Sequence, residues 1–303
     1  MNYSMKLSDF FQDSDILRDG EFHTLGYVDS NTKGTLSYCD TISYLQKANQ
    51  NQNIGCIITK KQIADQVEPH KGVVLSPNPR NTFYVLHNSL LENKNYGLRL
   101  EYDMGDKCTI HHSAVVSKRT RIGHNVTIAE NVVIKDEVMI GDNTFVDAGV
   151  VIGCEGLLYV VEDGNLVFVR HVGGVKIGKN VTILSNAVIA RSIHDHLLTT
   201  VGENTIIGVA SNVGHEAKIG NNCAISSHCV IARRAKICDG AWVGPSSVIR
   251  EHVMIGKFAQ VKMGSIVVKD VKENQAVSGN FALDHKINLL HYAQVEEAIK
   301  NRA

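Results

Sequence analysis

Beginning at Ile110, an aliphatic β-branched residue recurs at every sixth position of the chain, and no other feature constrains the fold as strongly. The period matches neither the turn of an α-helix nor the heptad of a coiled coil. After an interruption from Gly153 to about Gly174, the count resumes one residue out of phase and misses only at Asp195. The repeat positions are Ile110, Val116, Ile122, Ile128, Ile134, Ile140, Val146 and Ile152, then Ile177, Ile183, Ile189, Val201, Ile207, Val213, Ile219, Ile225, Ile231, Ile237, Val243, Ile249, Ile255, Val261 and Val267.

Such a repeat predicts a left-handed parallel β-helix. Six residues make one short strand and a turn, and three such units close a triangular coil whose aliphatic side chains point inward. Stacked coils then pair as parallel ladders about 4.8 Å apart. Gly often follows the aliphatic residue, as in Ile122-Gly123 and Ile255-Gly256. We expect positive φ at these corner glycines.

The flanking segments lack the repeat, so we expect a mainly β fold with three parts. Residues 1–105 predict a small α/β domain, with strands at 54–59 and 72–75 and a helix at 81–92. Residues 106–273 form the β-helix. Residues 274–303 form a tail whose apolar spacing predicts a helix at about 282–300.

Two excursions leave the predicted prism. Residues 153–174 contain two apolar runs around Asp163-Gly164, which is a hairpin signal. The second excursion is near His194-Asp195-His196, where a charged residue replaces the aliphatic one. Each excursion is either a surface loop without a direct function, in which case His194 and His196 are plain loop residues, or a loop that shapes a substrate groove.

Composition excludes several classes of function. The 31 basic and 31 acidic residues give zero net charge, so nothing points to nucleic acid. No run of about 18 apolar residues predicts a membrane span, and the N-terminus has no leader pattern. The seven cysteines form no CxxC pair. We therefore expect reduced, packed thiols in a cytoplasmic protein, without disulfides or a metal site.

Several segments resemble one family. Gly34-Thr-Leu-Ser-Tyr38, followed by Tyr44, is similar to a segment whose two rings sandwich uracil. The run Val213-Gly-His215-Glu-Ala-Lys-Ile-Gly220 is similar to a catalytic histidine motif, and His252 follows His215 at the 37-residue spacing of a second active-site histidine. Asn78-Pro-Arg80 with Phe83, and residues 153–178, match further segments. Over nearly its whole length the chain resembles the UDP-3-O-acylglucosamine N-acyltransferases of lipid A biosynthesis.

The resemblance implies a homotrimer that transfers an acyl group to the amine of a UDP-linked amino sugar. The donor would be a phosphopantetheine thioester on acyl-carrier protein or coenzyme A, with no permanently bound cofactor. It implies uridine binding by Tyr38, Thr41 and Tyr44. It also implies a substrate groove that includes Tyr159, Phe168 and Arg191.

Imidazole suits a general base because its pKa lies near neutrality, so we assign that role to His215. His252, two coils and one residue later, would support the tetrahedral intermediate or position the donor. Gly214 and Glu216 would support catalysis, since a glycine lets backbone approach and backbone N–H groups stabilise an oxyanion.

Departures from the family pattern leave other functions open. The family's TIDRG becomes residues 188–192 with Ala190, and its Asp-Asn pair becomes Gly208-Val209, so the identity of the sugar is open. The pair His215-Glu216 also resembles acetyl-CoA-dependent N-acetyltransferases of surface-glycan pathways. A non-catalytic sugar-nucleotide scaffold is a further alternative. A zinc enzyme of the γ-carbonic anhydrase type is disfavoured, because the repeats lack a His-x4-His pair.

Overall fold

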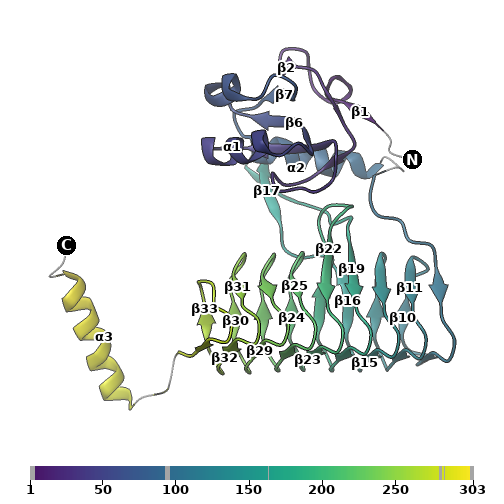
Figure 1. The fold of residues 1–303 in the computed structure, drawn as a ribbon, viewed down its shortest axis with the longest axis vertical. Coiled ribbons are helices and arrows are strands. Elements are labelled where there is room, and N and C mark those ends of the chain that lie inside the picture. Colours follow the sequence, from purple (N-terminus) through teal and green to yellow (C-terminus); the bar gives the residue numbers. More distant parts are fainter. Residues whose placement is uncertain (1–3, 93–95, 163, 280–281, 283, 301–303) are drawn as a thin grey trace.

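The computed structural model describes residues 4–92, 96–162, 164–279, 282 and 284–300. Figure 1 shows a mixed sheet with two helices above a long prism, with the C-terminal helix standing apart from both. The N-terminal domain and the prism, here called the two bodies, pack against each other along one edge of the prism. The site described below lies at that edge.

The N-terminal sheet has the order β2-β7-β6-β5-β4, with β2 antiparallel to β7 and the other neighbours parallel. The strands predicted at 54–59 and 72–75 are confirmed as β6 and β7. The predicted helix at 81–92 begins earlier, because the Asn78 side chain caps it, and it ends in a 3-10 turn. The elements are β1 (Met5–Lys6), β2 (Ile16–Arg18), β3 (Glu21–Phe22), β4 (Thr24–Leu25), β5 (Thr35–Cys39), α1 (Ile42–Gln50), β6 (Ile54–Thr59), β7 (Gly72–Leu75) and α2 (Pro79–Ser89), with 3-10 turns at Leu7–Asp9, Lys61–Gln66 and Leu90–Glu92.

The prism is the predicted left-handed parallel β-helix, with three parallel sheets as its faces. The first face holds β8 (Asp103–Met104), β11 (Thr120–Ile122), β14 (Val138–Ile140), β19 (Gly174–Ile177), β22 (Leu198–Val201), β25 (Lys218–Ile219), β28 (Lys236–Ile237) and β31 (Met254–Ile255). The second holds β9 (Thr109–Ile110), β12 (Thr127–Ile128), β15 (Phe145–Val146), β20 (Thr182–Ile183), β23 (Ile206–Ile207), β26 (Ala224–Ile225), β29 (Trp242–Val243), β32 (Gln260–Val261) and β34 (Ala276–Val277). The third holds β10 (Val115–Val116), β13 (Val133–Ile134), β16 (Val151–Cys154), β21 (Val188–Ala190), β24 (Asn212–Val213), β27 (Val230–Ile231), β30 (Val248–Ile249) and β33 (Ile266–Val267).

The repeat residues fill the prism. From Ile122 to Val267 they are buried in one continuous cluster, together with a second inward position two residues earlier in most units. In the remaining units that position is a buried Ser or Thr. Cys223 and Cys229 occupy that second position, as unpaired and buried thiols. Strand pairs keep the repeat in register, with Ile219 beside Ile237 and then Ile255. Each buried aliphatic side chain is therefore stacked on an equivalent one in the next coil, which is the contact that stabilises a solenoid.

The corner glycines correct one expectation. Gly123, Gly141 and Gly256 do not have positive φ; the left-handed residues lie two positions later, at residues such as Asn125 and Asn143. The glycines are needed for space, because a Cβ on Gly141 would lie 2.6 Å from the carbonyl carbon of Gly178 in the next coil. Asparagine takes the strained position at little cost.

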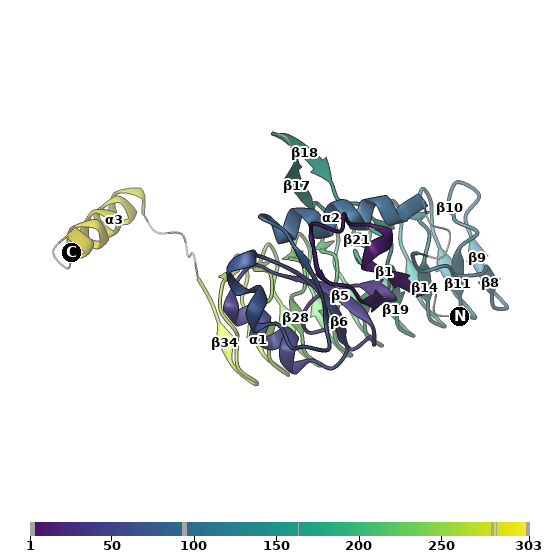
Figure 2. The same ribbon diagram turned by 90° about the horizontal axis from the view of Figure 1, so that it is seen from above.

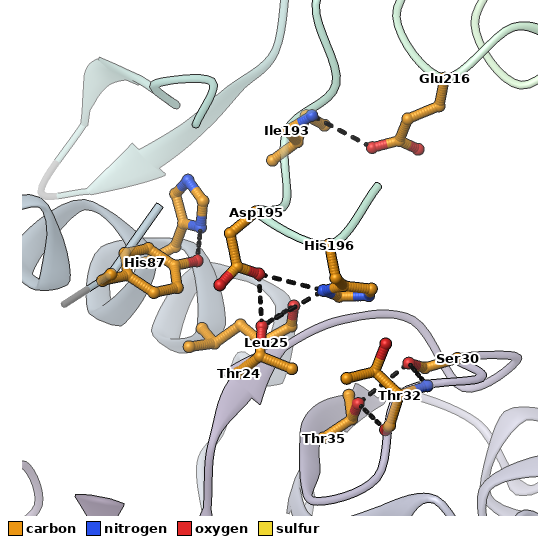
Figure 3. A network of polar contacts seen from close by, with 11 residues as sticks. Thr24, Leu25, Ser30, Thr32, Thr35, His87, Ile193, Asp195, His196 and Glu216 are labelled. Carbon is orange, nitrogen blue, oxygen red and sulfur yellow. Dashed lines mark hydrogen bonds and ion pairs between the residues drawn. The ribbon is translucent and has the colours of Figure 1, made fainter. Parts of the chain in front are cut away.

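The interruption of the repeat at Asp195 joins the two bodies. Asp195 Oδ1 accepts a hydrogen bond from the Thr24 hydroxyl at 2.6 Å and lies 3.0 Å from His196 Nδ1 (Figure 3). His194 beside it is completely buried against Tyr27 and Phe83. Residues 194–196 form a loop, which was one of the two alternatives, and the N-terminal domain covers His194 within it.

Two further elements leave the prism. Strands β17 (Tyr159–Glu162) and β18 (Asn165–Phe168) pair antiparallel, and Figure 2 shows them projecting beside α2. Asp163, half of the predicted turn, lies outside the described residues. The tail forms α3 (His285–Lys300), close to the predicted 282–300. Its apolar side chains, among them Leu290 and Ile299, are exposed.

Candidate active site

The two candidate histidines lie on the edge where the chain passes from the third face to the first, here called the histidine edge. His215 lies between β24 and β25, and His252 lies between β30 and β31. Glu216, Arg234 and His252 occupy equivalent left-handed positions at intervals of one coil, with φ of 62°, 56° and 62°. His252 is therefore two coils from Glu216, and His215 precedes that column by one residue.

His215 is buried, with an exposed fraction of 3%. Neither of its ring nitrogens has a hydrogen-bond partner among the described residues. Burial, then the charges of Arg233 and Arg234 and the proximity of His252, lower the pKa of His215 to about 4. The imidazole is consequently neutral at physiological pH, which is the protonation state that a general base requires.

Gly214 has a packing role in the structure. Its N–H donates to the Ile231 carbonyl at 2.8 Å, so this N–H does not serve as an oxyanion donor. A Cβ at Gly214 would lie 2.7 Å from the backbone nitrogen of Arg233. The missing side chain lets the next coil close against the loop that carries His215.

Glu216, predicted to support catalysis, makes its side-chain contacts with Tyr27, Ile193 and Arg234 rather than with His215. Glu216 Oε1 accepts hydrogen bonds from the Tyr27 hydroxyl at 3.2 Å and from the Ile193 N–H at 3.3 Å, the latter drawn in Figure 3. Its Oε2 lies 3.9 Å from Arg234 Nε. The left-handed backbone at Glu216 sends this carboxylate toward the N-terminal domain rather than toward His215. Burial raises its pKa.

A cavity of about 350 Å³ lies between the N-terminal domain and the histidine edge, and is here called the interdomain cavity. Its N-terminal wall holds four tyrosines together with two cations and two carboxylates, and its prism wall holds two arginines and His252. It is lined by Tyr27, Val28, Asp29, Ser37, Tyr38, Asp40, Tyr44, Lys47, Arg80, Tyr84, Leu158, Arg233, Arg234 and His252.

A second hollow, the corner groove, has a volume of about 550 Å³ on the prism side of the same edge. Arg233 lines both hollows, so they adjoin. The groove contains His215, whereas His252 faces the cavity. The groove is lined by Cys154, Glu155, Gly156, Leu157, Val188, Ala190, Asn212, Gly214, His215, Ala232, Arg233 and Glu251.

The structure brings together two of the three residues predicted to bind uridine. Tyr38 and Tyr44 both line the interdomain cavity. Tyr38 is fixed by Phe83, with ring centroids 5.0 Å apart, whereas Tyr44 is 54% exposed. Thr41 is not among the lining residues; its hydroxyl caps α1 by accepting from the Tyr44 N–H at 3.5 Å. Thr41 thus places Tyr44 rather than facing the cavity.

Four cations reach the interdomain cavity, from both bodies. Arg234 is held by Asp29 at 2.8 Å and lies over the Tyr27 ring, 4.2 Å from its centroid. Lys47, Arg80 and Arg233 complete the set. A hollow that combines aromatic ring faces with several cations suits a planar base joined to phosphates.

The residues predicted for the substrate groove have other surroundings. None of Tyr159, Phe168 and Arg191 lines the corner groove. Arg191 Nε donates to the Gly173 carbonyl at 2.8 Å. The Tyr159 carbonyl accepts from Arg80 at 3.1 Å. Only residues at the base of this excursion, such as Gly156, reach the groove, because its strands dock along α2.

Sequence reasoning missed two site residues. Arg233 links the two hollows and follows from the repeat, since it lies 18 residues, or one coil, after His215. His171 is 3% exposed and its ring packs edge-on against His215, with centroids 5.1 Å apart. It lies inside the first excursion, where no repeat predicts its position.

Comparison with known proteins gives the family. Residues 119–154 and 198–233 match a family model described as bacterial transferase hexapeptide (six repeats). The UDP-3-O-acylglucosamine N-acyltransferases of two Helicobacter pylori strains are 30% and 28% identical to this chain, each over 249 residues that cover 71% of this chain and 74% of the enzyme. The chain belongs to the UDP-3-O-acylglucosamine N-acyltransferase family. The family resemblance and the acyltransferase class predicted from the motifs are thereby confirmed.

Further relatives agree with this assignment. The UDP-3-O-acylglucosamine N-acyltransferase of Delftia acidovorans is 23% identical over 137 residues, which is 45% of this chain and 40% of that enzyme. The structure of a UDP-N-acetylglucosamine acyltransferase from Campylobacter jejuni matches with a TM-score of 0.53 and 25% identity, over 61% of this chain and 70% of that one. Within the described residues of this acyltransferase, no helix combines the length and apolar character needed to cross a bilayer.

Proposed function

We propose that this acyltransferase moves an acyl group from a phosphopantetheine thioester to the amine of a UDP-linked amino sugar, as in lipid A biosynthesis. One observation carries the proposal. A buried, neutral His215 lies in a groove that adjoins a cavity lined by four tyrosines, among them Tyr38 and Tyr44, and by several cations. The cavity suits a uridine diphosphate and the groove suits the reacting groups.

The acceptor would enter with uracil between Tyr38 and Tyr44. Aromatic rings on both faces of a planar base give binding beyond the area they bury. The phosphates would meet Arg80 and Arg233, whose guanidinium groups match phosphate oxygens. The sugar then reaches past Arg233 toward His215, because the two hollows share that side chain.

In the reaction, the neutral amine attacks the thioester carbonyl carbon and forms the new C–N bond, while the carbonyl oxygen becomes an oxyanion. His215 takes one proton from the attacking nitrogen, which becomes acidic as the bond forms. The intermediate then collapses, the C–S bond breaks, and the leaving thiolate receives the proton from His215. The products are an amide and a free phosphopantetheine thiol.

Assembly as a homotrimer is part of the proposal. The outward residues of the third face are nearly all apolar: Val115, Val133, Val151, Val188, Asn212, Val230, Val248 and Ile266. Outward residues of the first face include Arg121, Lys176, Lys218 and Lys236. An exposed apolar stripe of this length marks an interface, and the uncovered apolar side of α3 supports the same assembly.

The donor and the pathway are tested together by a matrix of substrates. UDP-3-O-acylglucosamine, UDP-glucosamine and a UDP-4-amino sugar are each incubated with a 3-hydroxyacyl carrier protein or with acetyl-CoA, and products are read by mass spectrometry. We expect amide formation with UDP-3-O-acylglucosamine and the carrier-protein thioester. Turnover only with acetyl-CoA and a 4-amino sugar would assign the enzyme to surface-glycan synthesis. Nucleotide binding without any turnover would indicate a scaffold.

We place the reaction in the cytoplasm, where unpaired cysteines like those of this chain stay reduced.

A further inference from the structure

His171 occupies a confined position behind the candidate base. It lies between β18 and β19, in the segment that returns from the hairpin to the prism. One side of its ring meets His215 at a centroid distance of 5.1 Å and an interplanar angle of 83°. The other neighbour is Phe168, nearly parallel at 6.2 Å and 22°.

The tautomer of His171 follows from one contact. Its Nδ1 lies 3.1 Å from the Val169 carbonyl, and a carbonyl only accepts, so Nδ1 carries the proton. Nε2 then holds a lone pair. This atom is buried and has no hydrogen-bond partner among the described residues. Burial, then the nearby His215, lower the pKa of His171 to about 3, so the lone pair stays available at every physiological pH.

His215 lacks what His171 could supply, namely an acceptor for a ring N–H. A general-base imidazole is normally oriented by an acceptor for the N–H of its second nitrogen, usually a carboxylate or a carbonyl. Both ring nitrogens of His215 lack a partner within the described chain. The charges that lower its pKa are those of Arg233, Arg234 and His252, none of which is an anion. Glu155 and Glu251 line the same groove but give His215 no hydrogen bond within the described chain. Glu216 is committed to Tyr27, the Ile193 N–H and Arg234.

We propose that His171 is the positioning residue of His215, with its Nε2 accepting the hydrogen bond that orients the base imidazole. This inference rests on the proposed acyl transfer by His215. The two rings are in edge-on contact without a hydrogen bond between them in this structure. Rotation of either imidazole would close the bond, since catalytic hydrogen bonds are often long or poorly aligned in the free enzyme. When His215 takes the amine proton, the lone pair of His171 stabilises the imidazolium.

Gly156 keeps the space that this pairing needs. A Cβ on Gly156 would lie 2.7 Å from His215 Cδ2 and 3.4 Å from His171 Nε2. A methyl group there would press on His215 beside His171. Glycine at this point of the excursion therefore belongs to the same arrangement, although it carries no chemistry itself.

The test compares His171→Leu, His171→Gln and His87→Gln. The glutamine at 171 restores an acceptor. His87 is a comparably buried histidine that bonds Tyr96 and the Arg170 carbonyl and whose ring packs on Tyr84, Tyr96 and His194 rather than on His215. We expect His171→Leu to lower kcat at least 10-fold with KM for the UDP-sugar within 2-fold, and His171→Gln to recover much of the loss. His87→Gln should keep kcat within 2-fold.

A second readout does not depend on turnover. The titration of the His215 imidazole is followed by NMR, with the signal assigned by its loss in His215→Ala. His171→Leu should move its midpoint to lower pH, because the acceptor that stabilises the imidazolium is gone, and His171→Gln should move it less. An unmoved midpoint, or a kcat loss no larger than that of His87→Gln, would overturn the proposal. Absence of turnover in the unmodified enzyme would instead overturn the proposed function, while the NMR comparison would still decide the pairing.

Discussion

Glu216 and Tyr27 join the two halves of the interdomain cavity, with the tyrosine hydroxyl donating to the carboxylate at 3.2 Å. The same carboxylate accepts from the Ile193 N–H and lies beside Arg234. Glu216 follows the candidate base His215 in the sequence, but its side chain points to the other side of the backbone, toward the N-terminal domain. It fixes the N-terminal domain and the Arg234 guanidinium above the prism.

Glu216→Gln separates this role from that of a His–Glu catalytic pair. Glutamine keeps an oxygen for Tyr27 and Ile193 but loses the charge that faces Arg234. We expect a modest loss of stability, about 1–2 kcal/mol by analogy with other charged hydrogen bonds, and kcat within about 3-fold of the original, measured by thermal melts and steady-state kinetics. A fall in kcat of two orders of magnitude or more at unchanged stability would show instead that Glu216 acts with His215 as a catalytic pair.

His215→Ala removes the proposed base. Because general-base catalysis typically contributes 10²–10⁴-fold, we expect kcat to fall by about that factor while KM for the UDP-sugar changes little. The measurement is single-turnover amide formation. His228→Asn is the matched control, since His228 is also a corner residue, with φ of 59°, and asparagine accepts that conformation. Near-normal turnover of His215→Ala would refute the mechanism.

Tyr44→Ala removes one face of the proposed uracil site. An aromatic stacking contact contributes about 0.5–1.5 kcal/mol beyond buried area, so we expect Kd for UDP to rise roughly 2–13-fold. Isothermal titration with UDP measures this directly. The control is Tyr102→Ala, a similarly exposed tyrosine that lies outside the interdomain cavity. Equal losses for both variants would contradict uracil stacking.

Acid should destabilise the enzyme at the contact between its two bodies. Burial lowers the pKa of His87 to about 4 and of His194 well below its ordinary value, so both are neutral in the folded state. In the unfolded chain they take up protons near pH 6.5. Above pH 6.5 these rings bind no protons in either state, whereas between pH 6.5 and about 4 the unfolded chain binds protons that the folded protein does not, so stability falls with pH. Each ring costs about 1.4 kcal/mol of stability per pH unit as the pH falls through that window.

Thermal melts between pH 7.5 and 4.5 check this expectation. The midpoint should fall as the pH drops, and His87→Gln should make the dependence less steep. Glu216, whose pKa burial raises, acts in the opposite direction, but as a single group. A melting temperature independent of pH across the window would contradict the account.

Charge on the third face should disrupt the proposed trimer. Val230 and Ile266 point outward there and are 40% and 62% exposed. Light scattering should give three times the 33.2 kDa chain mass for the unmodified protein and a lower mass for Val230→Lys with Ile266→Lys. Lys236→Glu on the first face should leave the mass unchanged. An unmodified protein of single-chain mass would contradict the assembly.

The prism could be predicted because the residues that recur with its six-residue period are aliphatic, and aliphatic side chains must be buried. Ile219 and Ile237 lie in adjacent coils since a six-residue step repeated three times returns the chain to the same face. The two strands of the N-terminal sheet, β6 and β7, were found for a similar reason, as short apolar runs. Local pattern and tertiary environment agree in these elements.

The site was only partly predictable. The positions of His215 and His252 follow from the repeat, but the direction of the Glu216 side chain depends on a left-handed backbone and on the docked domain. His171 reaches His215 through an excursion that has no period. Contacts of this kind come from tertiary packing between segments distant in sequence, which neither spacing nor propensity encodes.

The close stacking of the corner glycines also makes the prism a molecular ruler. Since no side chain fits between coils at Gly141 or Gly256, each coil adds one fixed step of about 4.8 Å along the axis. Gain or loss of a whole 18-residue coil after His252 would shift the C-terminal helix by one step and leave the geometry around His215 unchanged. Length at that end can therefore vary in discrete units without altering the chemistry.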